Sequence, residues 1–157
     1  MSVRTVYIDS SVIGGYFDTE WEIATRELWH QWRQGGWRFV TSTVTAAEML
    51  RAPDPVRQLF CDTFSPADLL GCGLEVETLA EQYLSAGVVP RKYSDDARHV
   101  AACVSAGCLV LVSWNFRHLT NVTREAGFNA VNLLQGHPTL RIVSPLELIY
   151  ENETEDL

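Results

Sequence analysis

Three carboxylates that lie far apart in the sequence each stand at the end of a predicted strand or near the start of a predicted helix. Asp9 directly follows an apolar, strand-like run, Glu48 lies near the start of a helical segment, and Asp96 lies in the first turn of another. In an open parallel sheet these positions share the edge at which the strands end and ligands bind. We therefore expect the three side chains to meet.

Carboxylates at close range repel one another, and at least one would take up a proton unless a cation lay between them. A hard divalent cation such as Mg²⁺ prefers oxygen ligands and usually takes one or two carboxylates together with waters. Such an ion can polarise a phosphate and lower the pKa of a bound water. The pattern predicts a metal site formed by Asp9, Glu48 and Asp96.

Each of these acids also has a simpler explanation. Asp9 stands where an aspartate can cap a helix by accepting backbone N–H groups. The run from Thr45 to Glu48 fits a capping box, in which the glutamate reaches back to the capping residue. Asp95 and Asp96 both lie in a first helical turn, where the helix dipole favours negative charge. The metal-site hypothesis therefore depends on the joint arrangement.

A second group of polar residues follows the third predicted strand. Ser113 ends this strand and Asn115 follows it, and Arg117 and His118 follow Asn115 closely enough to contact an incoming phosphate. His99 lies one helical turn beyond Asp96, and we include Ser113, Arg117, His118 and His99 as candidates for substrate binding. Each also has a local alternative, as a turn residue, an exposed arginine or a packed histidine. Weaker candidates for contact with a substrate are Arg91, Lys92 and Trp114, the last through base stacking.

The elements that must position these residues alternate along the chain. The predicted strands are 3–8, 37–41, 109–113 and 140–143, and the predicted helices are 20–34, one around Glu48, 56–64, 74–86, 95–106 and 145–150. Residues 10–15 follow the first strand, with a turn predicted at Gly14-Gly15. Strands separated by helices favour crossover connections and a mainly parallel sheet covered on both faces. We expect a three-layer α/β/α sandwich formed by one domain, residues 1–150, followed by an acidic, frayed tail, 151–157.

The composition is that of a globular protein. The 157 residues are 46% hydrophobic and 20% charged, and no apolar run reaches the roughly 20 residues that span a bilayer. We expect a cytoplasmic protein without a membrane partner. Four cysteines without a C-x-x-C pair are expected to be reduced and mostly buried. The net charge of −8 disfavours general coating of nucleic acid, although four of the negative charges lie in the last seven residues.

Four segments in this order resemble the motifs of the PIN-domain family, in particular the VapC-like toxins of bacterial toxin–antitoxin pairs. These are Y-I-D-S-S-V-I with Asp9, S-T-V-T-A-A-E-M-L with Glu48, D-A-R-H-V-A-A with Asp96, and L-V-S-W-N-F-R-H-L with Asn115. The resemblance covers the chain from Val6 to about Tyr150. It brings the metal-binding acids of the family onto Asp9, Glu48 and Asp96, and selects Asp96 rather than Asp95.

The resemblance implies an α/β/α sandwich, RNA cleavage that depends on Mg²⁺ or Mn²⁺, a homodimer and, for the toxins, inhibition by a small antitoxin protein. The fourth motif departs from the family pattern, because it has Asn115 where an aspartate is usual. An asparagine can still offer a carbonyl oxygen to a metal or a water, and for this reason we include Asn115 among the catalytic residues. The alternative is that Asn115 only closes a turn.

Three functions remain open at this point. The first is a metal-dependent endoribonuclease, and the second is a weakly active or inactive PIN-fold module that binds RNA or a partner protein. The third is a phosphotransfer domain, which is disfavoured because position 11 is a serine and the only lysine, Lys92, lies in mid-chain.

Overall fold

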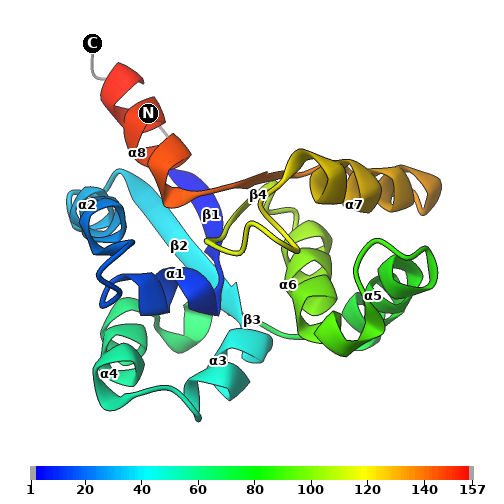
Figure 1. The fold of residues 1–157 in the computed structure, drawn as a ribbon, viewed down its shortest axis with the longest axis horizontal. Helices are drawn as coiled ribbons and strands as arrows, with labels where there is room; N and C mark the ends of the chain where they lie inside the picture. Colours follow the sequence, from blue (N-terminus) through cyan, green and yellow to red (C-terminus); the bar gives the residue numbers. More distant parts are fainter. Residues whose placement is uncertain (1–2, 156–157) are drawn as a thin grey trace.

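Five parallel strands form the central sheet, in the order β3-β2-β1-β4-β5 (Figure 1). The structure is a computed structural model that describes residues 3–155, with side chains described as far as residue 151. The strands are β1 (Arg4–Ile8), β2 (Trp37–Ser42), β3 (Leu69–Leu70), β4 (Val110–Val112) and β5 (Arg141–Val143). The α-helices are α1 (Ser10–Gly15), α2 (Glu22–Arg33), α3 (Thr43–Met49), α4 (Asp54–Thr63), α5 (Leu74–Ser85), α6 (Ser94–Ser105), α7 (Val122–Leu134) and α8 (Pro145–Glu155).

Helices cover both faces of the sheet, which confirms the expected three-layer α/β/α sandwich (Figure 1). Buried side chains of α5, α6 and α7 form one hydrophobic cluster with the sheet, and those of α1, α2, α4 and α8 form another. Along β1, Tyr7 belongs to the first cluster, whereas Val6 and Ile8 belong to the second. A strand buried on both faces needs apolar residues at successive positions, which explains the unbroken apolar run.

Two segments differ from the prediction because their structure depends on a few local contacts. Residues 10–15 were predicted only to contain a turn at Gly14-Gly15, but they form helix α1, since Asp9 caps it by accepting the backbone N–H of Val12 at 3.2 Å. The two-residue strand β3 was not predicted. It pairs in parallel with the end of β2 and is too short to show any periodicity in the sequence.

Helix α7 was also not predicted. Its start is capped by Asn121, whose side chain accepts the backbone N–H of Arg124 at 2.8 Å. Within it, Gly127 packs against Val88, and a Cβ at this glycine would lie 3.1 Å from a Val88 methyl carbon. This glycine, which disfavours a helix by propensity, thus lets α7 pack closely against Val88.

Helix α8 continues five residues beyond its predicted end. It reaches Glu155, so the backbone of the predicted frayed tail is helical to this point, while residues 1–2 and 156–157, which belong to the predicted domain and tail, lie outside the described residues. Within 3–155, no helix has both the length and the apolar character needed to cross a membrane.

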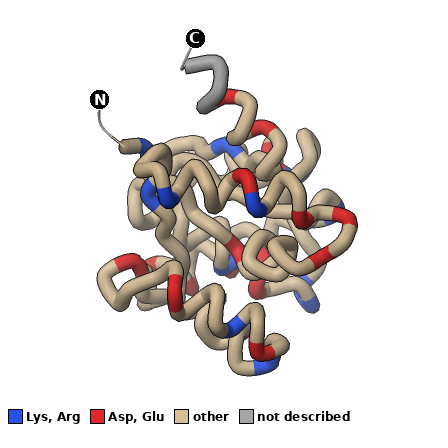
Figure 2. The backbone as a smooth tube through the Cα atoms, turned by 90° about the vertical axis from the view of Figure 1, so that its left-hand side faces the viewer, with Lys and Arg blue, Asp and Glu red and all other residues tan. Residues whose placement is uncertain are grey.

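Charged positions of both signs are interspersed along the backbone rather than gathered in one basic patch (Figure 2). Many arginines are bound by nearby carboxylates. Arg98 contacts both Glu77 and Asp95, and Arg91 contacts Glu81. These pairs neutralise much of the positive charge locally.

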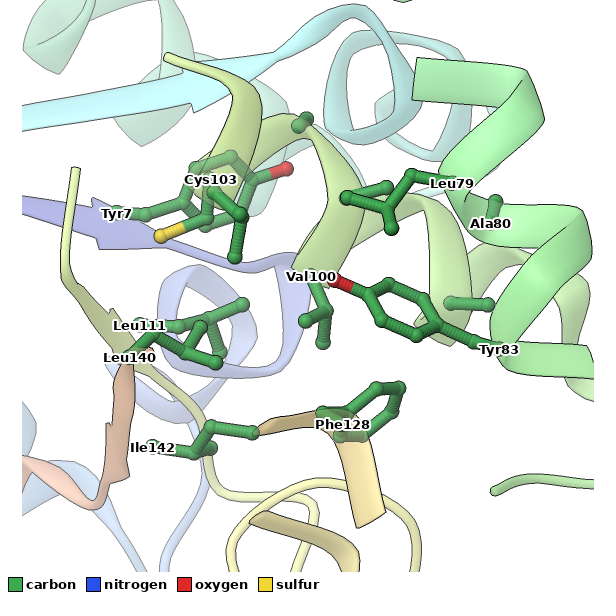
Figure 3. Close-up of a cluster of buried hydrophobic side chains, with 14 of the residues drawn as sticks. Tyr7, Leu79, Ala80, Tyr83, Val100, Cys103, Leu111, Phe128, Leu140 and Ile142 are labelled. Carbon is green, nitrogen blue, oxygen red and sulfur yellow. The ribbon is translucent and has the colours of Figure 1, made fainter. Parts of the chain in front are cut away.

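The hydrophobic cluster between the sheet and α5–α7 contains polar atoms as well as apolar ones. Tyr7, Val100, Cys103, Leu111 and Phe128 lie together in it (Figure 3). All four cysteines of the chain are free thiols. Cys103 and Cys108 are buried, but Cys61 is exposed and Cys72 half-buried, so the prediction of mostly buried thiols holds for only two of them.

Candidate active site

Asp9 lies at the carboxyl end of the central strand, where it is only 3% exposed. Its Oδ1 accepts hydrogen bonds from Ser11 Oγ at 2.6 Å and from the backbone N–H of Val12 at 3.2 Å. Burial raises the pKa of Asp9, while the charge of His99 and hydrogen bonds from Ser11, Ser113 and Val12 oppose this shift. The capping role that the sequence left open is thus present, in a carboxylate that a nearby cation would stabilise.

Glu48 does not take part in the predicted capping box. Helix α3 begins after Ser42, whose hydroxyl caps it, while Thr45 is buried inside the helix. Glu48 projects instead toward two other elements: its Oε2 accepts a hydrogen bond from Ser10 Oγ at 3.0 Å, and its Oε1 lies 2.7 Å from His99 Nε2. These contacts hold the carboxylate of Glu48 against the start of α1 and the middle of α6.

A chain of buried hydrogen bonds continues from Glu48 into the core. His99 is 2% exposed, and its Nδ1 lies 2.7 Å from the hydroxyl of Tyr7, which in turn lies 2.6 Å from Ser42 Oγ. Burial raises the pKa of Tyr7, so its hydroxyl stays protonated and can donate to Ser42. The imidazole then donates to Tyr7 and to Glu48 when both ring nitrogens carry protons. The hydrogen-bonded histidine that the sequence allowed is therefore present.

The charge on His99 links the three carboxylates. Burial by itself lowers the pKa of His99, but its hydrogen bond to Glu48 and the charges of Asp9, Glu48 and Asp96 outweigh this and raise it above the ordinary value. All three acids therefore lie close enough to this imidazole to interact with it. A protonated His99 supplies part of the positive charge that the cluster needs.

Asp96 lies in the first turn of α6, with its side chain 19% exposed. Its pKa is raised to about 6, chiefly by burial and further by the charges of Asp9, Glu48 and Asp95, while the charge of His99 opposes the shift. Its neighbour Asp95 is exposed and forms an ion pair with Arg98 at 2.9 Å. The helical phase of α6 therefore directs Asp96 toward the other two acids and leaves Asp95 at the surface.

The segment after β4 is held by local hydrogen bonds. Ser113 is fully buried, and its Oγ accepts the backbone N–H of Asn115 at 2.9 Å. The side-chain oxygen of Asn115 accepts the backbone N–H of His118 at 3.1 Å, so the turn role considered for Asn115 is present. Trp114 is 6% exposed and stacks on Trp21 at 4.3 Å, so it packs in the core rather than facing a base.

His118 connects this segment with Asp96. Its Nδ1 lies 3.5 Å from Asp96 Oδ2, and its ring packs on Tyr93 at 3.9 Å between centroids. Burial lowers the pKa of His118, and the positive charges of Arg117, Arg124 and Lys92 lower it further. The exposed Arg117 thus lies near His118, beside the acidic cluster.

The structure brings the predicted metal ligands to one edge of the sheet, but their oxygens do not converge on one point. Among residues 3–155, no set of three or more His, Cys, Asp or Glu side chains has the geometry of a metal-binding group. The chemistry of the donors nevertheless fits a hard cation, because Asp9, Glu48 and Asp96 offer only oxygens and two of them raise the pKa of the third. Glu48 Oε2 accepts its hydrogen bond from the hydroxyl of Ser10. Because that hydroxyl can rotate, this oxygen can be released to bind a cation.

Several contributors to the site were missed in the sequence. The hydroxyls of Ser10 and Ser11 orient Glu48 and Asp9, and Tyr7 orients His99. Ser11 also accepts the backbone N–H of Trp114 at 2.9 Å and so joins α1 to the segment after β4. The sequence feature that could have indicated the role of the two serines is their position directly after Asp9. Tyr7 has none, because it reads as an ordinary residue of a buried strand.

Comparison with protein-family models and with curated proteins gives no match for this chain. The resemblance to PIN domains therefore depends on the four sequence segments, and the identity of the site depends on its own geometry.

Proposed function

We propose that the protein is a metal-dependent endoribonuclease of the PIN-domain kind, with Asp9, Glu48 and Asp96 as the ligands of Mg²⁺ or Mn²⁺. The observation that carries the proposal is the electrostatic coupling of the three acids. Burial, and after it the charges of Asp9 and Glu48, raises the pKa of Asp96, and the charges of all three acids raise the pKa of His99 against the effect of its burial. Such a surplus of negative charge in a partly buried cluster is what a bound divalent cation would relieve.

The cation, when bound, supplies a Lewis acid that polarises a phosphate and lowers the pKa of a water. The protein residues do the positioning. Ser10 and His99 fix the carboxylate of Glu48, and the backbone of α1 fixes that of Asp9. Arg117, whose charge acts on His118, would contact a phosphate of the RNA. The same proposal includes two further points. The protein would act as the toxin of a pair with a small antitoxin protein, and it would form a homodimer.

The test is cleavage of a single-stranded RNA by the purified protein in Mn²⁺ and in excess chelator, with Asp9→Asn and Asp96→Asn as variants. We expect cleavage in Mn²⁺, none in chelator, and a loss of at least about 100-fold in each variant, because each removes an anionic ligand. Circular dichroism of the variants shows whether they remain folded. Equal cleavage by folded variants, or in chelator, would exclude the proposed mechanism.

A second candidate function is supported by the hydrogen bonds of the site. Glu48 has both oxygens bound to protein groups, and Asn115 uses its side-chain oxygen to close a turn. These contacts favour a PIN-fold module that binds RNA or a partner protein with little or no cleavage. Calorimetric titration with Mn²⁺ separates the two functions: heat that disappears in Asp96→Asn supports the nuclease, and retained RNA binding without such heat supports the module.

A further inference from the structure

A groove of about 320 Å³ lies directly beside Glu48. It is bordered by α3, by Cys72 in the segment before α5, and by the first turns of α5 and α6. Its volume is at the low end of the range for small-ligand pockets, about 300–1,000 Å³. The groove therefore suits a short stretch of an extended chain that continues past the candidate active site.

The charged side chains along this groove are not equivalent. Arg98 donates to both oxygens of Glu77, at 2.9 and 3.2 Å, and to Asp95 at 2.9 Å. Its guanidinium is thus already engaged by two carboxylates. Glu48 is held by His99 and by Ser10.

Arg51 is the exception in the groove. It lies one helical turn beyond Glu48, is exposed, and has no hydrogen bond or ion pair with any side chain in the described part of the chain. Its backbone is fixed, since its N–H donates to the carbonyl of Glu48 at 3.2 Å. In the same part of the chain, the other guanidiniums without any hydrogen bond or ion pair are those of Arg33, on α2, and Arg117, whereas Arg124 is held by the backbone carbonyls of Val88 and Arg117.

We infer that Arg51 binds a backbone phosphate of the RNA, so that the strand enters along this groove and passes Glu48 toward Arg117. The inference rests on the proposed function for the nature of the ligand. A guanidinium offers a planar fork of donors that matches two phosphate oxygens. Two of the three unpartnered arginines then flank the acidic cluster, Arg51 just beyond the end of α3 and Arg117 in the segment after β4, where a polyanion would otherwise be repelled.

The test measures binding without cleavage. A fluorescein-labelled, mixed-sequence single-stranded RNA of about 12 nucleotides is titrated with the full-length protein in chelator, and anisotropy is recorded at several salt concentrations. Arg51→Ala is expected to weaken binding about tenfold, the loss of one charge-assisted contact. The slope of log affinity against log salt should fall by about 0.7. Arg51→Lys should recover part of the loss, because the charge remains without the fork.

Arg33→Ala is the matched control, since it removes an equally exposed and unpartnered arginine and changes the net charge by the same amount. It should change the affinity less than twofold. Equal losses in the two variants, or no RNA binding by the unaltered protein, would overturn the inference. Full competition by polyglutamate at equal charge would overturn it too, because the groove would then be a site for acidic peptides.

Failure of the proposed nuclease activity gives a different result. If the protein does not cleave RNA in Mn²⁺ but Arg51→Ala still weakens binding selectively, the phosphate site stands and the catalytic proposal falls. If cleavage occurs and disappears in Asp96→Asn while Arg51→Ala binds RNA normally, the catalytic proposal stands and Arg51 has no role in binding.

Discussion

Asp96 shows most clearly how the environment of one residue changes its chemistry. Its pKa lies at about 6 in the folded chain, whereas an unperturbed aspartate titrates near 3.8. The folded protein therefore holds this proton more tightly than the unfolded chain does. At pH 7 the group is ionised in a place that disfavours its charge, and the protein loses stability for that reason.

Asp96→Asn is expected to stabilise the metal-free protein at pH 7, by up to about 3 kcal/mol for a shift of about two pKa units. The contribution of Asp96 to stability falls as the pH rises from about 4 to 6, and this part of the pH dependence should vanish in the variant. The pKa values of Asp9 and His99 are also raised, so their contributions to stability fall with rising pH as well. The stability of the Asp96→Asn variant should therefore still decrease somewhat as the pH rises. Urea unfolding at pH 4.5 and pH 7 measures both effects. A variant that is less stable at pH 7 would contradict the assignment of Asp96 to a strained acidic cluster.

His99 is the second residue whose role can be isolated. It joins Tyr7 to Glu48 through its two ring nitrogens, both in nearly water-free surroundings. Removing one partner of a buried hydrogen bond leaves the other unsatisfied, at a cost of about 1–3 kcal/mol.

We expect Tyr7→Phe and His99→Gln each to destabilise the protein by about 1–3 kcal/mol. In the double variant, the combined loss should be smaller than the sum by about 1 kcal/mol, since both changes break the same bond. Denaturant unfolding of the four proteins in this double-mutant cycle gives the coupling. Additive losses would mean that the Tyr7–His99 contact contributes nothing to stability.

At the scale of elements, helix α1 connects the central strand to the segment after β4. Asp9 caps it, Ser11 binds the backbone of Trp114, and Gly15 lies against the indole of the same tryptophan. The indole N–H of Trp114 donates to Thr25 Oγ1 at 3.0 Å, which ties α2 into the same contact. The position of the polar segment after Trp114 therefore depends on how closely α1 approaches it.

Two neighbouring glycines in α1 make a matched pair of substitutions. A Cβ at Gly15 would lie 2.7 Å from Trp114 Nε1, so Gly15→Ala should displace the indole and destabilise the protein by about 1–3 kcal/mol. A Cβ at Gly14 would have no atom within 4 Å, and Gly14→Ala should stabilise the helix by up to about 1 kcal/mol. Denaturant unfolding gives the free energies, and tryptophan emission reports the displaced indole. Equal effects of the two alanines would show that the close approach is not required.

At the scale of the whole molecule, two hydrophobic clusters on opposite faces of one parallel sheet hold the acidic edge together. The chain carries a net charge of −8, yet many of its arginines are used in ion pairs between neighbouring elements. This distribution leaves few positive charges for a polyanion. It explains why Arg51 and Arg117, which have no such partner among the described residues, matter for the proposed contact with RNA.

The sequence by itself determined the architecture and the approximate place of the candidate site. The apolar runs and their spacing are local properties, and they predicted four of the five strands of the described sheet and most of the helices. The same local pattern predicted that the three acids lie at strand ends and helix starts, and so at one edge of the sheet. The elements that it missed, such as α1 and β3, depend on a cap or on pairing that no local spacing reveals.

The tertiary structure decided what each polar residue does. Whether Glu48 closes a capping box or meets His99 depends on the packing of α3 against α6, which lies outside any sequence window. Whether Asp95 or Asp96 joins the acidic cluster depends on which side of α6 faces the sheet. Burial and the distance between charges set the properties of these groups, and both exist only once segments distant in sequence are brought together by folding.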